Sequence, residues 1–221
     1  MPTLIDLYYT FYGNRVIAPE YTKQYDLGFT YIKAYERQML AQISIQSDVY
    51  FNKIKNKIVA IPGNSGIWSV VNLGLVEIKG IDVNIQSVWN FSDQLSLTTG
   101  ITYTYQQAIN ADRASESYKD QIPYTPKHSG AFLASMAYKR LSMNYSFIYT
   151  GERYNQSSNN IYNYVQPWYT HDIAFHYNTT LYKRKIRITT EINNLLDQDY
   201  EVVANFPMPG RNYRFTLAYN Y

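Results

Sequence analysis

The stretch NYRFTLAYNY, residues 212–221, decides the fold of this chain. Its residues alternate between two chemical classes. The odd positions are apolar or aromatic: Tyr213, Phe215, Leu217, Tyr219 and Tyr221. The even positions are polar or small: Asn212, Arg214, Thr216, Ala218 and Asn220. Because successive side chains of a β-strand point to opposite faces, this alternation predicts a strand with one apolar face and one polar face.

The same two-residue period recurs along nearly the whole chain. Just upstream, Ile186 and Ile188 alternate with Arg187 and Thr189. The pattern predicts nine strands, over residues 24–34, 38–61, 67–90, 94–107, 127–139, 141–154, 168–181, 185–195 and 210–221. The chain is therefore expected to be all-β and antiparallel, with no helix in its framework.

The predicted connections alternate between short and long. Tight joins fall near residues 35–37, 91–93, 140 and 182–184, whereas long polar loops cover residues 108–126, 155–167 and 196–209. The link at residues 62–66 is the exception, because it is short but lies on the long-loop side. Strands of about ten residues or more, with short turns at one end and long loops at the other, are typical of a transmembrane antiparallel β-barrel. A soluble, tyrosine-rich β-sheet protein is the less favoured interpretation.

Composition excludes several classes of protein. Of 221 residues, 46 % are apolar, 17 % are charged and 25 are tyrosines, which is too apolar for a disordered tail and too weakly charged for a typical soluble surface. The net charge is only +3 and no basic run stands out, so no nucleic-acid partner is expected. The absence of cysteine removes thiolate metal sites, disulfides and cysteine nucleophiles.

The chain is expected to be part of a larger barrel. No apolar run reaches the roughly 18 residues of a membrane-spanning helix, and MPTLIDLYYT at the start has no features of a secretory signal. A sheet in hydrocarbon must close, because unpaired edge groups cost several kcal/mol each, and single-chain bacterial barrels have even strand numbers. An odd count of nine predicted strands therefore favours a fragment whose remaining strands come from elsewhere.

Four stretches of the chain resemble one known family, the TonB-dependent outer-membrane receptors. The most specific is EINNLLDQDYEVVANFPMPGRNYRFTLAYNY, residues 191–221. The others are PTLIDLYY followed by APEYTKQYDLG near the start, NLGLVEIKGIDV at residues 72–83, and IPYTPKH with YTGERY within residues 122–154. The resemblance covers essentially all of residues 1–221. It implies about nine C-terminal strands of a roughly 22-stranded barrel in the bacterial outer membrane, preceded by further strands and a plug domain.

The resemblance also implies a function and a set of partners. The family takes up large, scarce ligands such as ferric siderophores, haem or cobalamin, with energy delivered by the TonB complex through a region upstream of this chain. The PMPGRNY pattern favours a siderophore or a cobalamin-like ligand. In the haem receptors of the family, a histidine ligand typically lies between stretches that resemble PTLIDLYY and APE. Residues 8–18 contain no histidine, so haem bound through that ligand is disfavoured, although a tyrosine could take its place. The partners implied are outer-membrane lipid, the plug, the remaining strands and TonB. The alternative is a passive porin or a partnered interaction barrel.

The long loops contain the candidate ligand-binding residues. Aromatic rings and cations at a channel mouth suit an anionic, ring-containing ligand. The candidates are Tyr118, Tyr124, Arg153, Tyr154, Tyr162, Tyr164 and Trp168, with Arg113 and Lys119 nearby. These tyrosines can equally stabilise one another. Tyrosines on the apolar parity of the strands are instead expected to anchor the protein at the membrane interface: Tyr138, Tyr145, Tyr177, Tyr213 and Tyr219.

The last strand has a second expected role, because a terminal aromatic that closes an alternating strand resembles the barrel-assembly signal of the family. That signal comprises Tyr213, Phe215, Leu217, Tyr219 and Tyr221. No catalytic, metal or cofactor site is predicted. His128, His171 and His176 lack metal-ligand spacing, and the last two should point to opposite faces of one strand. The acids Asp26, Asp48, Asp82, Asp172 and Glu191 are interpreted as a hydrated polar wall.

Overall fold

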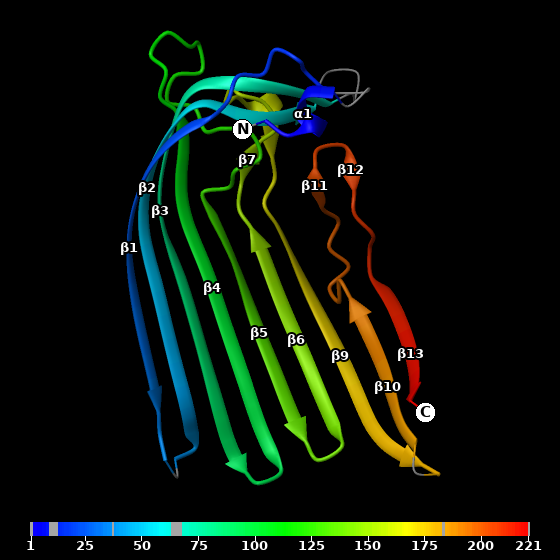
Figure 1. Ribbon diagram of the computed structural model, residues 1–221. Helices are drawn as coiled ribbons and strands as arrows, with labels where there is room; N and C mark the ends of the chain where they lie inside the picture. The colour runs from blue at the N-terminus through cyan, green and yellow to red at the C-terminus, as the bar shows by residue number, and fades with distance from the viewer. Residues whose placement is uncertain (1, 9–12, 37, 63–67, 183, 221) are drawn as a thin grey trace.

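The computed structural model describes residues 2–8, 13–36, 38–62, 68–182 and 184–220. Its framework is one antiparallel sheet of nine strands in the order β1-β2-β3-β4-β5-β6-β9-β10-β13 (Figure 1). These strands are β1 (Tyr21–Ala34), β2 (Leu40–Pro62), β3 (Trp68–Ser92), β4 (Leu95–Asn110), β5 (His128–Tyr138), β6 (Leu141–Thr150), β9 (Trp168–Leu181), β10 (Arg184–Asn193) and β13 (Asn212–Asn220). Each strand pairs with its sequence neighbour in the sheet, which confirms the predicted all-β antiparallel fold.

The sheet is not closed within the described residues, because its order begins at β1 and ends at β13. The short connections gather at one end of the sheet and the long ones at the other (Figure 1). We call these the hairpin end and the loop end. The upper parts of β2 and β3 bend over at the loop end. No helix in the described part of the chain is long and apolar enough to cross a membrane.

The loop end contains small elements that the periodicity did not predict. They are α1 (Leu4–Tyr8), η1 (Ile161–Asn163), the pair β7 (Arg153–Tyr154) with β8 (Tyr164–Val165), and the pair β11 (Glu201–Val203) with β12 (Phe206–Pro207). The predicted strand 141–154 is therefore too long: β6 ends at Thr150, and β7 pairs with β8 outside the large sheet. Part of the predicted 62–66 link lies outside the described residues.

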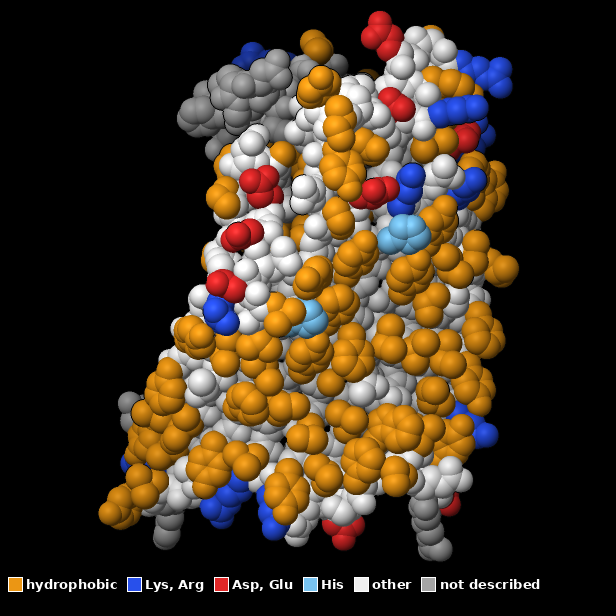
Figure 2. All heavy atoms as spheres, turned by 180° about the vertical axis from the view of Figure 1, so that it is seen from behind, with side chains coloured by type: hydrophobic (Ala, Val, Ile, Leu, Met, Phe, Trp, Pro, Cys, Tyr) orange, Lys and Arg blue, Asp and Glu red, His pale blue; other side chains and the backbone are white. Residues whose placement is uncertain are grey.

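The strand register sorts the side chains onto two faces. Asp48 lies opposite Asp82, which lies opposite Thr104, so these residues share one face. We call this the polar face. Tyr25 lies opposite Phe51 on the other, apolar face, and their rings stack at 6.5 Å. Hydrophobic side chains cover this second face over most of the sheet (Figure 2).

A small cluster of buried apolar side chains lies at the loop end. Val76, Ala108 and Ile122 form its centre, with Leu73 and Ile78 packed against them. On the apolar face, Leu27 and Phe29 remain 76 % and 60 % exposed. A sheet with one large exposed apolar face needs an apolar environment or another protein surface to cover it.

Candidate functional site

The predicted ligand residues all lie at the loop end, but they differ in exposure. Tyr162 in η1 is 92 % exposed and Tyr118 is 37 % exposed. The side chains of Tyr124, Tyr154, Tyr164 and Trp168 are partly buried, and Arg153 is buried. Tyr162 is therefore the member of the set whose side chain is most accessible from solution.

Arg153 joins three segments of the loop end. Its guanidinium donates hydrogen bonds to the backbone carbonyls of Gln166 (3.0 Å), Glu201 (2.7 Å) and Val202 (2.9 Å). It is only 2 % exposed, and burial lowers its pKa from the usual value. In this arrangement Arg153 positions the loops. Its contact with a ligand, expected from the sequence, stays a prediction.

The partly buried aromatic residues pack against one another. The Tyr154 and Tyr164 rings meet edge to face at 6.0 Å, and the Trp168 and Tyr200 rings lie 4.8 Å apart. Burial raises the pKa of Tyr124 above its ordinary value, and its hydroxyl accepts a hydrogen bond from the Ala204 amide at 3.4 Å. This packing agrees with the interpretation that loop tyrosines stabilise one another.

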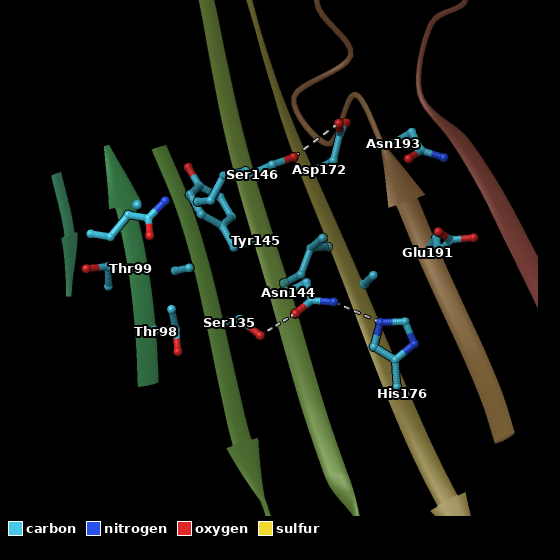
Figure 3. Close-up of a pocket in the computed structure, with 16 residues that line it drawn as sticks. Thr98, Thr99, Ser135, Asn144, Tyr145, Ser146, Asp172, His176, Glu191 and Asn193 are labelled. Atoms are coloured by element: carbon cyan, nitrogen blue, oxygen red, sulfur yellow. Dashed lines mark hydrogen bonds between the residues drawn. The ribbon is translucent and has the colours of Figure 1, made fainter. Parts of the chain in front are cut away.

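A groove on the polar face forms a second candidate site (Figure 3). Its cavity volume is about 610 Å³, and the lining residues come from β3, β4, β5, β6, β9 and β10. Three of them, together with Thr189, form a hydrogen-bonded series across β5, β6, β9 and β10. Ser135 Oγ donates to Asn144 Oδ1 at 2.7 Å, Asn144 Nδ2 lies 3.0 Å from His176 Nε2, and His176 Nδ1 lies 2.9 Å from Thr189 Oγ1.

The series sets the tautomer of His176. Because the Asn144 amide group can only donate through Nδ2, His176 Nε2 accepts and its Nδ1–H donates to Thr189. The series forms part of the polar wall of this groove. Asn144 and Thr189 were not singled out from the sequence. Their position on the polar parity was the signal that could have identified them.

Acidic residues on the polar face are held by neighbouring strands and loops. Asp172 accepts a hydrogen bond from the Asn194 amide at 2.7 Å, and so fixes the start of the last long loop. Glu191 pairs with Arg214 of β13, with Arg214 Nη2 2.9 Å from Oε1. Asp82 accepts a hydrogen bond from Thr104 at 2.6 Å. These contacts place the predicted acids on one polar wall.

The three histidines do not come together. His128 and His171 lie on the apolar face, where Tyr103 and Tyr145 hydroxyls approach their Nδ1 atoms at 2.8 and 2.6 Å. His176 lies on the polar face, so the predicted opposite orientation of His171 and His176 is confirmed. Within the described residues, no group of three His, Cys, Asp or Glu side chains is arranged to hold a metal ion.

The predicted barrel-assembly residues share the apolar face of β13. Tyr213, Phe215, Leu217 and Tyr219 are 71 %, 69 %, 62 % and 49 % exposed. Tyr221 lies outside the described residues. The four described side chains alternate as the sequence predicted, on a strand that pairs only with β10 in the part of the chain that the structure describes. Their role in assembly stays a prediction.

Comparisons with known proteins agree on one family. The family described as "TonB dependent receptor-like, beta-barrel" matches residues 1–195. The vitamin B12 transporter BtuB of Photobacterium profundum is 25 % identical over 224 residues, which cover 100 % of this chain and 33 % of that protein. The chain thus spans about one third of the length of this relative.

Solved structures show the same fold. The siderophore receptor PiuA from Acinetobacter baumannii superposes with a TM-score of 0.65 at 18 % identity, covering 92 % of this chain and 29 % of PiuA. The copper transporter OprC gives a TM-score of 0.65 at 15 % identity, covering 96 % of this chain and 33 % of OprC. BtuB and OprC are described as transporters and PiuA as a receptor.

Proposed function

This chain belongs to the TonB-dependent receptor β-barrel family, and from that premise we propose that it forms part of the wall of an outer-membrane importer. The importer would take up a ferric siderophore, cobalamin or a similar large, scarce ligand in an energy-dependent step. One observation carries the proposal: nine antiparallel strands have an apolar face, a grooved polar face, and long loops at one end only.

The physical argument for a barrel comes from the two sheet edges. The outer edges of β1 and β13 present backbone N–H and C=O groups that no strand pairs within the described residues. In hydrocarbon each unpaired group costs several kcal/mol, so a sheet with this apolar face must close. We propose that residues 1–221 are the C-terminal part of a roughly 22-stranded barrel in the bacterial outer membrane. Earlier strands, a plug and the TonB-contacting region would belong to the same longer protein.

The support for the ligand class comes from the loop end and from the relatives. BtuB is described as a vitamin B12 transporter and PiuA as a siderophore receptor. An exposed tyrosine at the mouth can stack on the ring system of such a ligand. Tyr162 suits this contact best, because it is 92 % exposed on η1. We propose Tyr162 and Tyr118 as first contacts, with Tyr124, Arg153, Tyr154, Tyr164 and Trp168 contacting the ligand after the loops rearrange.

The test of transport is ligand uptake by cells that express the intact protein. Labelled cyanocobalamin and iron-labelled siderophores are the probes, measured in matched strains with and without TonB. The expected result is uptake of one probe that depends on TonB. Uptake of small solutes that is equal in both strains, with steady conductance in planar bilayers, would instead identify a passive porin and overturn the importer proposal.

The test of the ligand contact is a matched pair of tyrosine variants. Tyr162 is 92 % exposed at the loop end, and Tyr182 is 91 % exposed at the hairpin end. Tyr162→Ala is expected to weaken binding of the transported probe about tenfold, a common effect for an aromatic anchor. Tyr182→Ala should leave the dissociation constant unchanged. Equal effects of both variants would remove Tyr162 from the binding site.

A further inference from the structure

Four lysines cluster on the apolar-face parity of β1–β3 near the loop end. Lys23 of β1 lies opposite Lys53 of β2, and Lys79 of β3 lies opposite Phe51. Lys55 follows Lys53 on the same face of β2, one two-residue step farther toward the loops. We call these residues, Lys23, Lys53, Lys55 and Lys79, the lysine cluster.

The lysine cluster has an unbalanced charge. Like charges directly opposite on neighbouring strands repel each other, and Lys23 and Lys53 are such a pair. Glu77 is the acid that lies among them, with an oxygen 3.0 Å from Lys53 Nζ. Four lysines and one glutamate leave a local charge of +3. Because these like charges repel one another, an anion between the side chains would stabilise the cluster.

A cleft gives such an anion a place to bind. Lys53, Lys55 and Glu77 line a cavity of about 630 Å³ together with Arg113 and Tyr118 of the loop after β4. Asp112 also lines the cleft, where its Oδ1 accepts a hydrogen bond from the Ala114 amide at 3.0 Å. The cationic donors in the cleft are therefore lysine ammonium groups and the Arg113 guanidinium, which are the groups that bind phosphate.

The position of the lysine cluster indicates the source of the phosphate. The stacked Tyr25 and Phe51 rings lie next to it on the same face, and exposed Leu27, Phe29 and Val49 continue the apolar surface toward the hairpin end. Figure 2 shows Lys and Arg side chains above the hydrophobic band, with acidic side chains among them. Aromatic residues mark the membrane interface, and cations just beyond them meet lipid headgroups.

The cluster is local and does not extend along the whole rim. At the loop end of β9 and β13, the residues on the apolar face are aromatic, namely Tyr169, His171 and Tyr213. If the rim were attracted to an anionic membrane surface without a specific site, its cations could be spread around the rim. Their grouping over β1–β3 instead indicates one binding site. We propose that the lysine cluster and Arg113 form a binding site for the phosphate groups of an anionic glycolipid in the outer leaflet. This inference rests on the membrane location proposed above.

The experiment measures lipid binding to the purified intact protein in detergent. The probe is bis-phosphorylated lipid A, and its matched control is the same lipid with both phosphates removed; native mass spectrometry counts the bound molecules. The test variant is Lys23→Gln/Lys55→Gln, which leaves the Lys53–Glu77 ion pair in place. The control variant is Lys33→Gln/Lys139→Gln, which removes two positive charges near the hairpin end.

The test variant is expected to bind bis-phosphorylated lipid A about 25-fold more weakly, from a factor of about five for each lysine near an anionic surface. The control variant should bind like the unmodified protein. Equal losses in both variants, no loss in either, or equal binding of the dephosphorylated lipid would overturn the proposal. Competition by millimolar inorganic phosphate that abolishes lipid binding would assign the site to a free anion instead and would also overturn it.

This experiment separates the lipid site from the transport proposal. Each variant is first checked for folding by the heat-dependent gel mobility of an intact barrel. If the protein binds the lipid as expected but imports no probe, the lipid site is supported and the importer proposal fails. If the protein imports a probe but its two lysine variants bind the lipid equally, the importer proposal is supported and the lipid site fails.

Discussion

The hairpin end and the loop end of the sheet are stabilised in different ways. At the hairpin end, residues 139–140 join β5 to β6, and Lys139 and Tyr182 adopt φ angles of 53° and 49°. Such turns are formed by local backbone geometry. At the loop end, Arg153 donates to carbonyls that lie 48 and 49 residues away. The hairpin end can therefore form from neighbours in sequence, whereas the loop end depends on contacts that exist only after folding.

Removal of Arg153 should give the largest effect. Arg153→Met is expected to lower the free energy of unfolding by about 3 kcal/mol, because buried backbone carbonyls lose their donors. The loss of stability should be greatest at the loop end, where the hydrogen-exchange rates of residues 153–165 and 201–207 should rise. The exposed Arg113 supplies the control, since Arg113→Met should change stability by less than about 0.5 kcal/mol. If Arg153→Met leaves hydrogen exchange at the loop end unchanged, the loop end does not depend on the long-range contacts of Arg153.

A methyl group at Gly80 tests the sheet between the two ends. A Cβ at Gly80 would lie 2.5 Å from the carbonyl oxygen of Tyr105, so the backbone of β3 or β4 must shift. Gly80→Ala is expected to cost about 2 kcal/mol in urea unfolding. At Gly100 the nearest atom to a Cβ is 3.9 Å away, and Gly100→Ala should be neutral or slightly stabilising. Equal effects of the two variants would contradict the close approach at Gly80.

A glycine at Lys139 tests the local character of the hairpin end. A left-handed conformation costs a residue with a side chain about 1–2 kcal/mol, and glycine avoids this cost. Glycine also loses more backbone entropy on folding, which offsets about 0.5–1 kcal/mol of the gain. Lys139→Gly is therefore expected to stabilise by roughly 0.5 kcal/mol. Arg140, the next residue in the same turn, does not have positive φ. Arg140→Gly should destabilise, and the same sign for both variants would show that the turn does not depend on φ.

Ionisation of Tyr124 should give the smallest effect, confined to high pH. Burial raises its pKa in the folded state, so the neutral hydroxyl is favoured there. Its contribution to stability is fully present below the unfolded value of about 10 and is lost as pH rises through the raised folded value. Loop-end hydrogen exchange, corrected for its intrinsic pH dependence, should accelerate in that range. In Tyr124→Phe this acceleration of hydrogen exchange at high pH should disappear. If the acceleration persists, another group causes it.

Sequence periodicity predicted the sheet because the signal is local. The predicted strand 168–181 coincides with β9, and predicted 127–139 differs from β5 by one residue at each end. The largest error, at the end of β6, arises because alternation continues past Thr150 although the chain leaves the sheet to form β7. Nothing in a strand pattern encodes which carbonyls a distant arginine will reach.

For the candidate site, the sequence identified the loop residues but not their different environments. Tyr162 and Arg153 were both predicted to contact the ligand, yet one is 92 % and the other 2 % exposed. The polar series through Asn144, His176 and Thr189 was also missed, because its members lie on three strands separated by other segments. Such groupings depend on strand register, which the pairing of the strands sets.

The sequence by itself determined the strands, their two faces, the two kinds of connection and the family, because each of these depends on residues that are close together in the sequence. Only the tertiary structure decided that Arg153 is enclosed and that Lys23 meets Lys53 across two strands. The physical reason is range. Alternation follows from the geometry of one strand, whereas burial and charge pairing follow from how strands distant in sequence are brought into register.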